Sequence, residues 1–79
     1  MIIMKALMEK DLPHGLNQLL HFWQGEEMDP EVRKKVCHGE IPEEEEVKMF
    51  LEWCQTDYAQ DGMLEEDKKA LQDILAKMN

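Results

Sequence analysis

The stretch Pro42–Tyr58, PEEEEVKMFLEWCQTDY, decides the fold that we predict for this chain. A proline followed by glutamates is typical of a helix start, where carboxylates meet the positive end of the helix dipole. The apolar residues that follow recur at the spacing of one helix face. They are Val47, Phe50, Leu51, Cys54 and Tyr58, with Met49 and Trp53 beside them. We therefore expect a central helix over residues 42–58, covered on more than one side, with Cys54 in the core.

Two further helices are predicted before this central one. The first covers residues 14–24, and we expect Gly25 to end it in the left-handed conformation. Its apolar stripe consists of Leu16, Leu19, Leu20 and Trp23. The second covers residues 29–38, with Val32 and Val36 on its buried side and Gly39 after its end.

Both ends of the chain are also predicted to be helical. Residues 64–78 combine an apolar stripe that starts at Leu64 with acids in the first turn and Lys77 in the last. Residues 2–10 carry the apolar spacing of a helix, although strand pairing of so short an apolar segment is an alternative. The sequence contains no linker, low-complexity tract or long repeat. We expect an all-α fold, a small single-domain bundle of four to five short helices over residues 1–79.

Composition disfavours several classes of function. The 79 residues include 18 acidic and nine basic side chains, so the formal net charge is -9. Direct nucleic-acid binding needs clustered Lys and Arg and is not expected. There is no Ser, one Thr and only scattered Gly, which argues against a serine nucleophile and a phosphate-binding loop. We expect a protein that is not an enzyme and that needs no cofactor.

The sequence also lacks the usual targeting patterns. Its start, Met1–Met8, is apolar but short, contains Lys5, and is followed by charged residues instead of a small-residue cleavage site. Without an export signal, Cys37 and Cys54 are expected to be reduced thiols. We therefore predict a cytoplasmic protein without membrane contact.

One segment resembles a metal-binding motif in part. Residues 57–68 match five of the twelve positions of an EF-hand loop, but Ala59 replaces one calcium ligand and Lys68 replaces the bidentate Glu. The three His and two Cys residues lack the spacing of zinc sites. We expect no bound metal and a plain acidic turn between two helices, and metal sensing is an alternative.

The negative charge is concentrated in residues 40–73, which hold twelve acidic and three basic residues. This pattern predicts either a solvated face, with Glu44 paired to Lys48, or a docking surface that attracts a basic partner. The one basic cluster, Arg33 to Lys35, is expected to balance neighbouring acids.

We interpret the chain as a small acidic protein-binding module: an adaptor, inhibitor or regulatory subunit that docks a protein with a basic surface. An apolar patch would add affinity, and exposed aromatic residues are the best anchors. Phe22 lies off the stripe of its helix, so we expect Phe22 or Trp23 to stay exposed. The candidate partner-binding residues are Phe22, Trp23, Glu43, Glu44, Glu45, Glu46, Glu65 and Glu66.

Two other functions remain open. Carboxylates at residues 43–46 would imitate nucleic-acid phosphates if the protein inhibits a DNA- or RNA-binding protein. A structural homo-oligomer, such as a homodimer, would instead pair through the apolar N-terminal helix, where Met1, Met4 and Met8 supply adaptable contacts.

Overall fold

The computed structural model describes residues 7–78 and the side chains of residues 7–77. The α-helices in this part of the chain are α1 (His14–Phe22), α2 (Pro30–Cys37), α3 (Glu43–Cys54), α4 (Asp57–Asp61) and α5 (Glu65–Met78). A 3-10 turn, η1 (Glu9–Asp11), precedes α1, and a π-helical turn, η2 (Trp23–Glu27), continues it. Residues 7–78 contain no strand, so the expected all-α fold with four to five short helices is confirmed.

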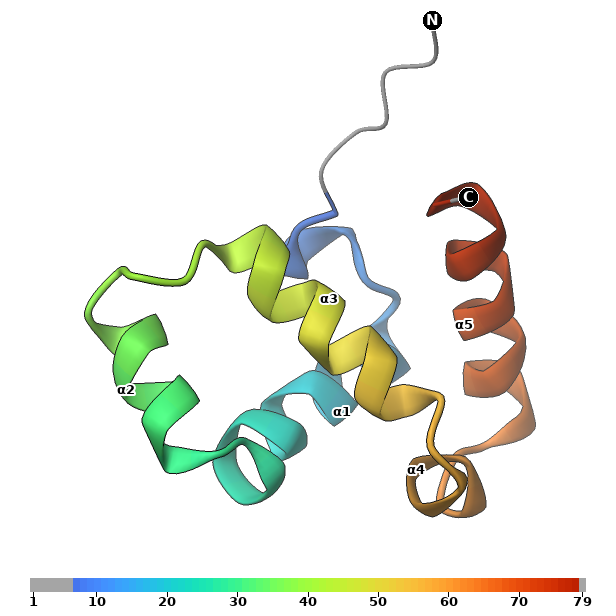
Figure 1. Ribbon diagram of the computed structural model, residues 1–79. Coiled ribbons are helices and arrows are strands. Elements are labelled where there is room, and N and C mark those ends of the chain that lie inside the picture. The colour runs from blue at the N-terminus through green and yellow to red at the C-terminus, as the bar shows by residue number, and fades with distance from the viewer. Residues whose placement is uncertain (1–6, 79) are drawn as a thin grey trace, which may run out of the picture.

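The helix α3 lies in the middle of the molecule, between α2 on one side and α5 on the other (Figure 1). Its residues Val47, Phe50 and Cys54 have no exposed surface. Leu51 of the same helix is buried as well, and the segments around α3 contribute Leu16, Leu20, Trp23, Met28 and Leu71 among other buried apolar residues. The prediction that this helix is central is therefore confirmed, and a single core cluster joins α3 to residues of α1, η2, α2 and α5.

The two cysteines have different surroundings, and both are free thiols. Cys54 is fully buried in the core, as predicted, and burial raises its pKa to about 12. Cys37 is exposed at the end of α2.

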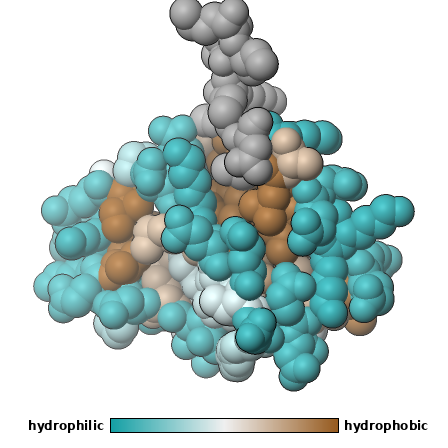
Figure 2. All heavy atoms as spheres, turned by 45° about the vertical axis from the view of Figure 1, so that its right-hand side comes forward, coloured by the Kyte–Doolittle hydropathy of each residue, from teal (hydrophilic) through white to brown (hydrophobic). Residues whose placement is uncertain are grey.

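On the face in Figure 2, hydrophilic residues cover most of the surface and hydrophobic residues show in its middle and at its left edge.

The predicted central helix is too long, because α3 ends at Cys54 and a new helix begins at Asp57. Gln55 and Thr56 separate them, and the backbone of Thr56 is extended. Its hydroxyl oxygen accepts a hydrogen bond from the Ala59 N–H at 3.2 Å and donates to the Trp53 carbonyl at 2.7 Å. Threonine is a favoured N-cap residue because its side chain satisfies a free N–H of the first turn. Tyr58 consequently leaves the stripe of α3 and is exposed.

The predicted end of the first helix is also wrong. Gly25 lies inside η2, and Gly39 is the one described residue with a positive φ, at 75°. The chain passes Gly25 in a wider turn, in which the Met28 N–H donates to the Trp23 carbonyl at 2.8 Å. The guanidinium of Arg33 donates to the Gln24 and Gly25 carbonyls at 2.8 and 3.0 Å. Arg33 therefore satisfies carbonyls at a helix end. The expectation that it balances neighbouring acids is wrong for this residue.

The ends of the described chain differ from the predictions in two further ways. Leu7 and Met8 are not helical, and only the 3-10 turn Glu9–Asp11 follows them. The rest of the predicted N-terminal helix lies outside the described residues. At the other end, α5 begins at Glu65, so Leu64 lies outside its periodicity and is 63% exposed.

The α2 prediction is nearly correct. Asp29 caps this helix by accepting a hydrogen bond from the Glu31 N–H at 2.8 Å, and Val32 and Val36 are half-buried against the core. Gly15 marks a close approach of α1 to α5, because a Cβ atom there would collide with the Asp67 carboxylate.

We predict that Thr56→Ala lowers the free energy of unfolding by about 0.5–2 kcal/mol, because the first turn of α4 loses its cap. Thr56→Ser keeps the hydroxyl and is expected to stay close to the wild type. Urea denaturation followed by circular dichroism measures both. Equal destabilisation by Ala and Ser would show that the methyl group matters and the cap does not.

Candidate functional site

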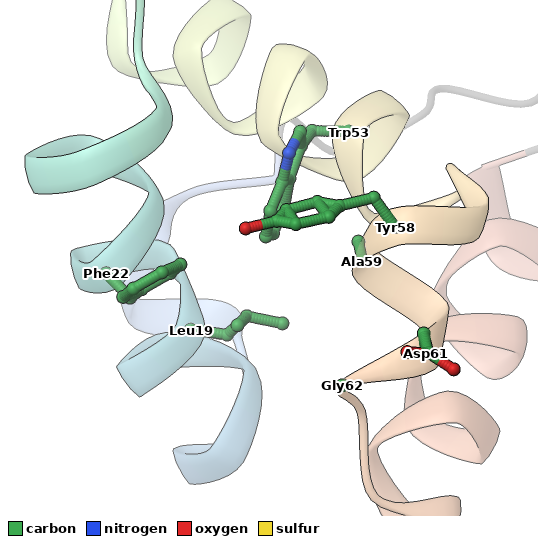
Figure 3. A pocket seen from close by; sticks show the side chains of 7 residues that line it. All are labelled: Leu19, Phe22, Trp53, Tyr58, Ala59, Asp61 and Gly62. Atoms are coloured by element: carbon green, nitrogen blue, oxygen red, sulfur yellow. The ribbon is translucent and has the colours of Figure 1, made fainter.

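A groove of about 450 Å³ opens between α1 and α4, and we call it the aromatic groove. Its lining residues are Leu19, Phe22, Trp53, Tyr58, Ala59, Asp61 and Gly62. In Figure 3, the side chains of Leu19 and Phe22 approach from α1, and those of Trp53 and Tyr58 approach from the opposite side. The walls are therefore mainly apolar, and Asp61 is the one acidic residue among those that line the groove.

Two of the wall residues are exposed aromatic side chains. Phe22 is 47% exposed and Tyr58 is 65% exposed. Trp23, the other aromatic candidate from the sequence, is only 5% exposed. Successive residues of a helix point about 100° apart, so Trp23 turns into the core when Phe22 points outward. There it packs against Phe50, with ring centroids 5.8 Å apart.

Tyr58 is held in place by contacts at both ends of its side chain. Its ring meets Trp53 edge-on, with centroids 6.4 Å apart. Its hydroxyl donates a hydrogen bond to a carboxylate oxygen of Glu27 at 3.2 Å. This bond, together with the negative charge of Glu27, raises the pKa of Tyr58 above its ordinary value of 10.0. The hydrogen bond links α4 to the end of η2.

The four glutamates at the start of α3 do not form one exposed surface. Glu45 is exposed and pairs with Lys48 at 3.6 Å, where the sequence predicted Glu44 as the partner. Glu44 is half-buried, and the carboxylate of Glu43 accepts a hydrogen bond from the Glu9 N–H at 3.1 Å.

Glu46 departs furthest from the expected exposed cluster, because it is only 6% exposed. It lies one helical turn before Phe50, on the side of α3 that faces the core, and its carboxylate accepts a hydrogen bond from the Gln24 amide at 3.1 Å. Burial raises the pKa of Glu46, and the negative charges of Glu9 and Glu43 add to this effect. The prediction that Glu46 belongs to an exposed acidic surface is therefore wrong.

The remaining acidic candidates lie elsewhere. Glu65 and Glu66 are exposed at the start of α5, and Glu65 pairs with Lys68 at 3.6 Å. The length of α3 separates them from Glu43–Glu46 (Figure 1). The acidic stretch 40–73 is thus divided between two ends of the molecule, and the end that includes Asp61 borders the aromatic groove.

The segment that resembles an EF-hand loop contains the helix α4, where the sequence predicted a plain turn. Within residues 7–78, no three His, Cys, Asp or Glu side chains converge in a way that would hold a metal ion. None of the helices described is long and apolar enough to cross a membrane.

The sequence interpretation identified Phe22 but missed its partners in the groove. Leu19, Trp53 and Tyr58 were assigned to the core by their helical spacing. The signal that would have identified Tyr58 is Thr56, because a Thr before Asp is a common helix start and ends the stripe of the preceding helix. No comparable signal in the sequence marks Leu19 or Trp53.

No protein-family model matches this chain, and neither the curated proteins nor the solved structures include a significant match.

We predict that Glu46→Gln raises the free energy of unfolding at neutral pH. Because the folded-state pKa of Glu46 is raised above 4.5, the folded protein binds more protons than the unfolded chain just above that pH. Stability therefore falls as pH rises through this window, and the ionised form stays less stable above it. The gain from Glu46→Gln should disappear below the ordinary pKa. Urea denaturation across acidic and neutral pH, with Glu45→Gln as the control, measures it, and a loss of stability at neutral pH would contradict the prediction.

A second prediction concerns the hydrogen bond between Tyr58 and Glu27. Tyr58 is the single tyrosine of the chain, so tyrosinate absorbance reports this residue alone. We expect a titration midpoint above 10.0 that falls in the Glu27→Gln variant, where the neighbouring charge is lost. Glu26→Gln is the matched control and should leave the midpoint in place. Equal shifts in both variants would indicate general charge effects without a specific bond.

Proposed function

We propose that this protein is a protein-binding module that docks a basic partner protein over the aromatic groove. The observation that carries the proposal is the pair of exposed aromatic residues, Phe22 and Tyr58, which border one groove with Leu19 and Trp53. Large aromatic side chains of this kind supply much of the binding energy at protein interfaces. In this proposal the protein acts in the cytoplasm as an adaptor, inhibitor or regulatory subunit and catalyses no reaction.

The groove is suited to hold an apolar side chain of a partner. Tyr58 is fixed by Trp53 and Glu27, so little side-chain freedom is lost when a partner covers it. Such preorganisation favours binding because less conformational entropy is lost on association. The half-buried Trp53 provides further apolar contact at the floor of the groove.

Charge supports a basic partner. The net charge of -9 attracts a positively charged protein over a long range and speeds the encounter. Asp61 lines the groove, and Glu27 lies at the hydroxyl of Tyr58. A Lys or Arg beside the apolar anchor of the partner would meet these carboxylates.

The geometry favours this function over mimicry of nucleic acid, one of the two alternatives from the sequence. Mimicry of nucleic-acid phosphates needs the glutamates 43–46 as one accessible array, and Glu46 is buried. The apolar N-terminal segment of the homo-oligomer alternative lies mostly outside the described residues, so that alternative stays a prediction. The aromatic groove does not depend on either feature.

The test compares the wild type with Phe22→Ala and Glu45→Gln in affinity capture from lysate of the protein's own source. We expect a partner that Glu45→Gln retains and that Phe22→Ala binds at least about tenfold more weakly, because a central aromatic anchor contributes more than about 1.4 kcal/mol. Circular dichroism and thermal unfolding confirm that both variants are folded. Capture should weaken as salt rises.

Two results would contradict the proposal. One is a partner that binds Phe22→Ala as well as the wild type, and the other is the absence of any partner that distinguishes the variants. A partner that is lost in Glu45→Gln and retained in Phe22→Ala would move the interface to the start of α3 and favour the nucleic-acid mimic.

A further inference from the structure

The aromatic groove is one end of a longer surface channel. A second depression, of about 250 Å³, shares Leu19, Phe22 and Gly62 with it. A third, of about 410 Å³, shares Gly15, Gln18, Leu64 and Asp67 with the second. Because neighbouring depressions share wall residues, the three lie side by side along α1, with α4 and the start of α5 opposite, and we call this row of depressions the channel. The close contact of Gly15 with Asp67 forms part of the wall that the second and third depressions share.

The exposed apolar residues of the molecule gather in this channel. Among the residues that the structure describes, the large hydrophobic side chains classed as exposed are Phe22, Tyr58 and Leu64, at 47%, 65% and 63%. Tyr58 lines the first depression, Phe22 the first and second, and Leu64 the second and third. Exposed apolar residues that cluster in this way mark interaction surfaces, whereas scattered ones need no explanation.

The charged residues of the channel have one sign. Asp61 lines the first depression, Asp67 the second and third, and Glu66 the third. Within residues 7–78, no Lys or Arg lines any of the three depressions. An occupant must therefore offer apolar side chains to the floor and positive charge to the acidic residues.

We infer that this channel seats a basic amphipathic helix of the partner, with apolar side chains at Tyr58, Phe22 and Leu64 and Lys or Arg beside Asp61, Glu66 and Asp67. The inference rests on the proposed function and specifies the chemistry of the partner segment. A helix fits because the channel is bounded by helices on both sides, and binding of an amphipathic helix in an apolar groove is a common recognition mode. The alternative of strand addition needs a sheet edge, and residues 7–78 form no strand.

A second copy of this chain fits the channel less well. Its net charge of -9 opposes close approach to an acidic surface. Its basic helix α2 does carry Lys34 and Lys35, but the apolar residues Val32 and Val36 of that helix pack against the core of their own chain. A separate protein supplies the positive charge without unpacking a helix.

The test uses a synthetic peptide of about 15 residues, near the shortest length that forms a helix in water, with Leu at helical spacing and Lys at the other positions. The matched peptide carries Glu in place of Lys. Nuclear magnetic resonance of the isotope-labelled full chain maps and measures binding. We expect saturable shifts at Leu19, Phe22, Tyr58 and Leu64 with the Lys peptide, weaker binding at higher salt, and no binding of the Glu peptide.

Substitutions then test the channel itself. Leu64→Ala should weaken binding of the Lys peptide about tenfold, because most of the exposed apolar side chain that the peptide would cover is removed. Asp67→Asn should weaken binding of the Lys peptide about two- to fivefold, as expected for the loss of a surface ion pair. Asp73→Asn is the matched control on the same helix, since Asp73 is exposed and lines none of the three depressions.

Several outcomes would overturn the inference. They are equal binding of both peptides, shifts confined to the start of α3, equal weakening by Asp67→Asn and Asp73→Asn, or binding weaker than about 1 mM. The inference would also be overturned if light scattering showed a dimer and the resonances of the channel residues moved on dilution. These results would assign the channel to a second copy. If a captured partner is lost in Phe22→Ala while the Lys peptide does not bind, the helix inference fails and the proposed function stands.

Discussion

The rest of the structure depends on the burial of one side of α3. A domain of this size buries only about 60% of the surface of its unfolded chain, so it has one core and little reserve. Val47, Phe50 and Cys54 have no solvent exposure, and every other described segment of the core packs around them. Phe50 in particular lies between Trp23 and Trp53, at centroid distances of 5.8 and 6.2 Å. The position of each surface feature follows from the way its segment meets this helix.

The candidate site follows from the end of that same helix. Because α3 stops at Cys54 and Thr56 starts α4, the chain turns, and Tyr58 reaches the surface next to Trp53. Across the groove, the stripe of α1 that buries Leu16 and Leu20 leaves Phe22 exposed and Leu19 half-buried at its edge. An apolar surface thus arises where two helices leave a gap that their own side chains do not fill.

Most of the fold could be predicted from the sequence because apolar periodicity identifies a buried helix face directly. The stripe through Val47, Phe50, Leu51 and Cys54 is an example, since all four are buried. The prediction was wrong at Tyr58 and Leu64, because the apolar spacing continues there across a helix boundary. Local hydrogen bonds determine where these helices begin. Spacing places Glu46 four residues before Phe50 on the buried side, but it does not reveal the partner of the carboxylate, the Gln24 amide, which comes from a distant segment. Of the site, Phe22 was predictable from its position off the stripe, whereas the channel depends on the spacing between helices.

The row of rings from Trp23 through Phe50 and Trp53 to Tyr58 joins the centre of the molecule to its surface. A small domain with such a continuous aromatic path has no clear division between residues that maintain the fold and residues that meet a partner. Anything that binds only the folded form shifts the folding equilibrium by mass action, and here it would do so through rings that touch the core. In the proposed complex, the stability of the folded protein would therefore be set jointly by its own core and by the concentration of the partner that covers Tyr58.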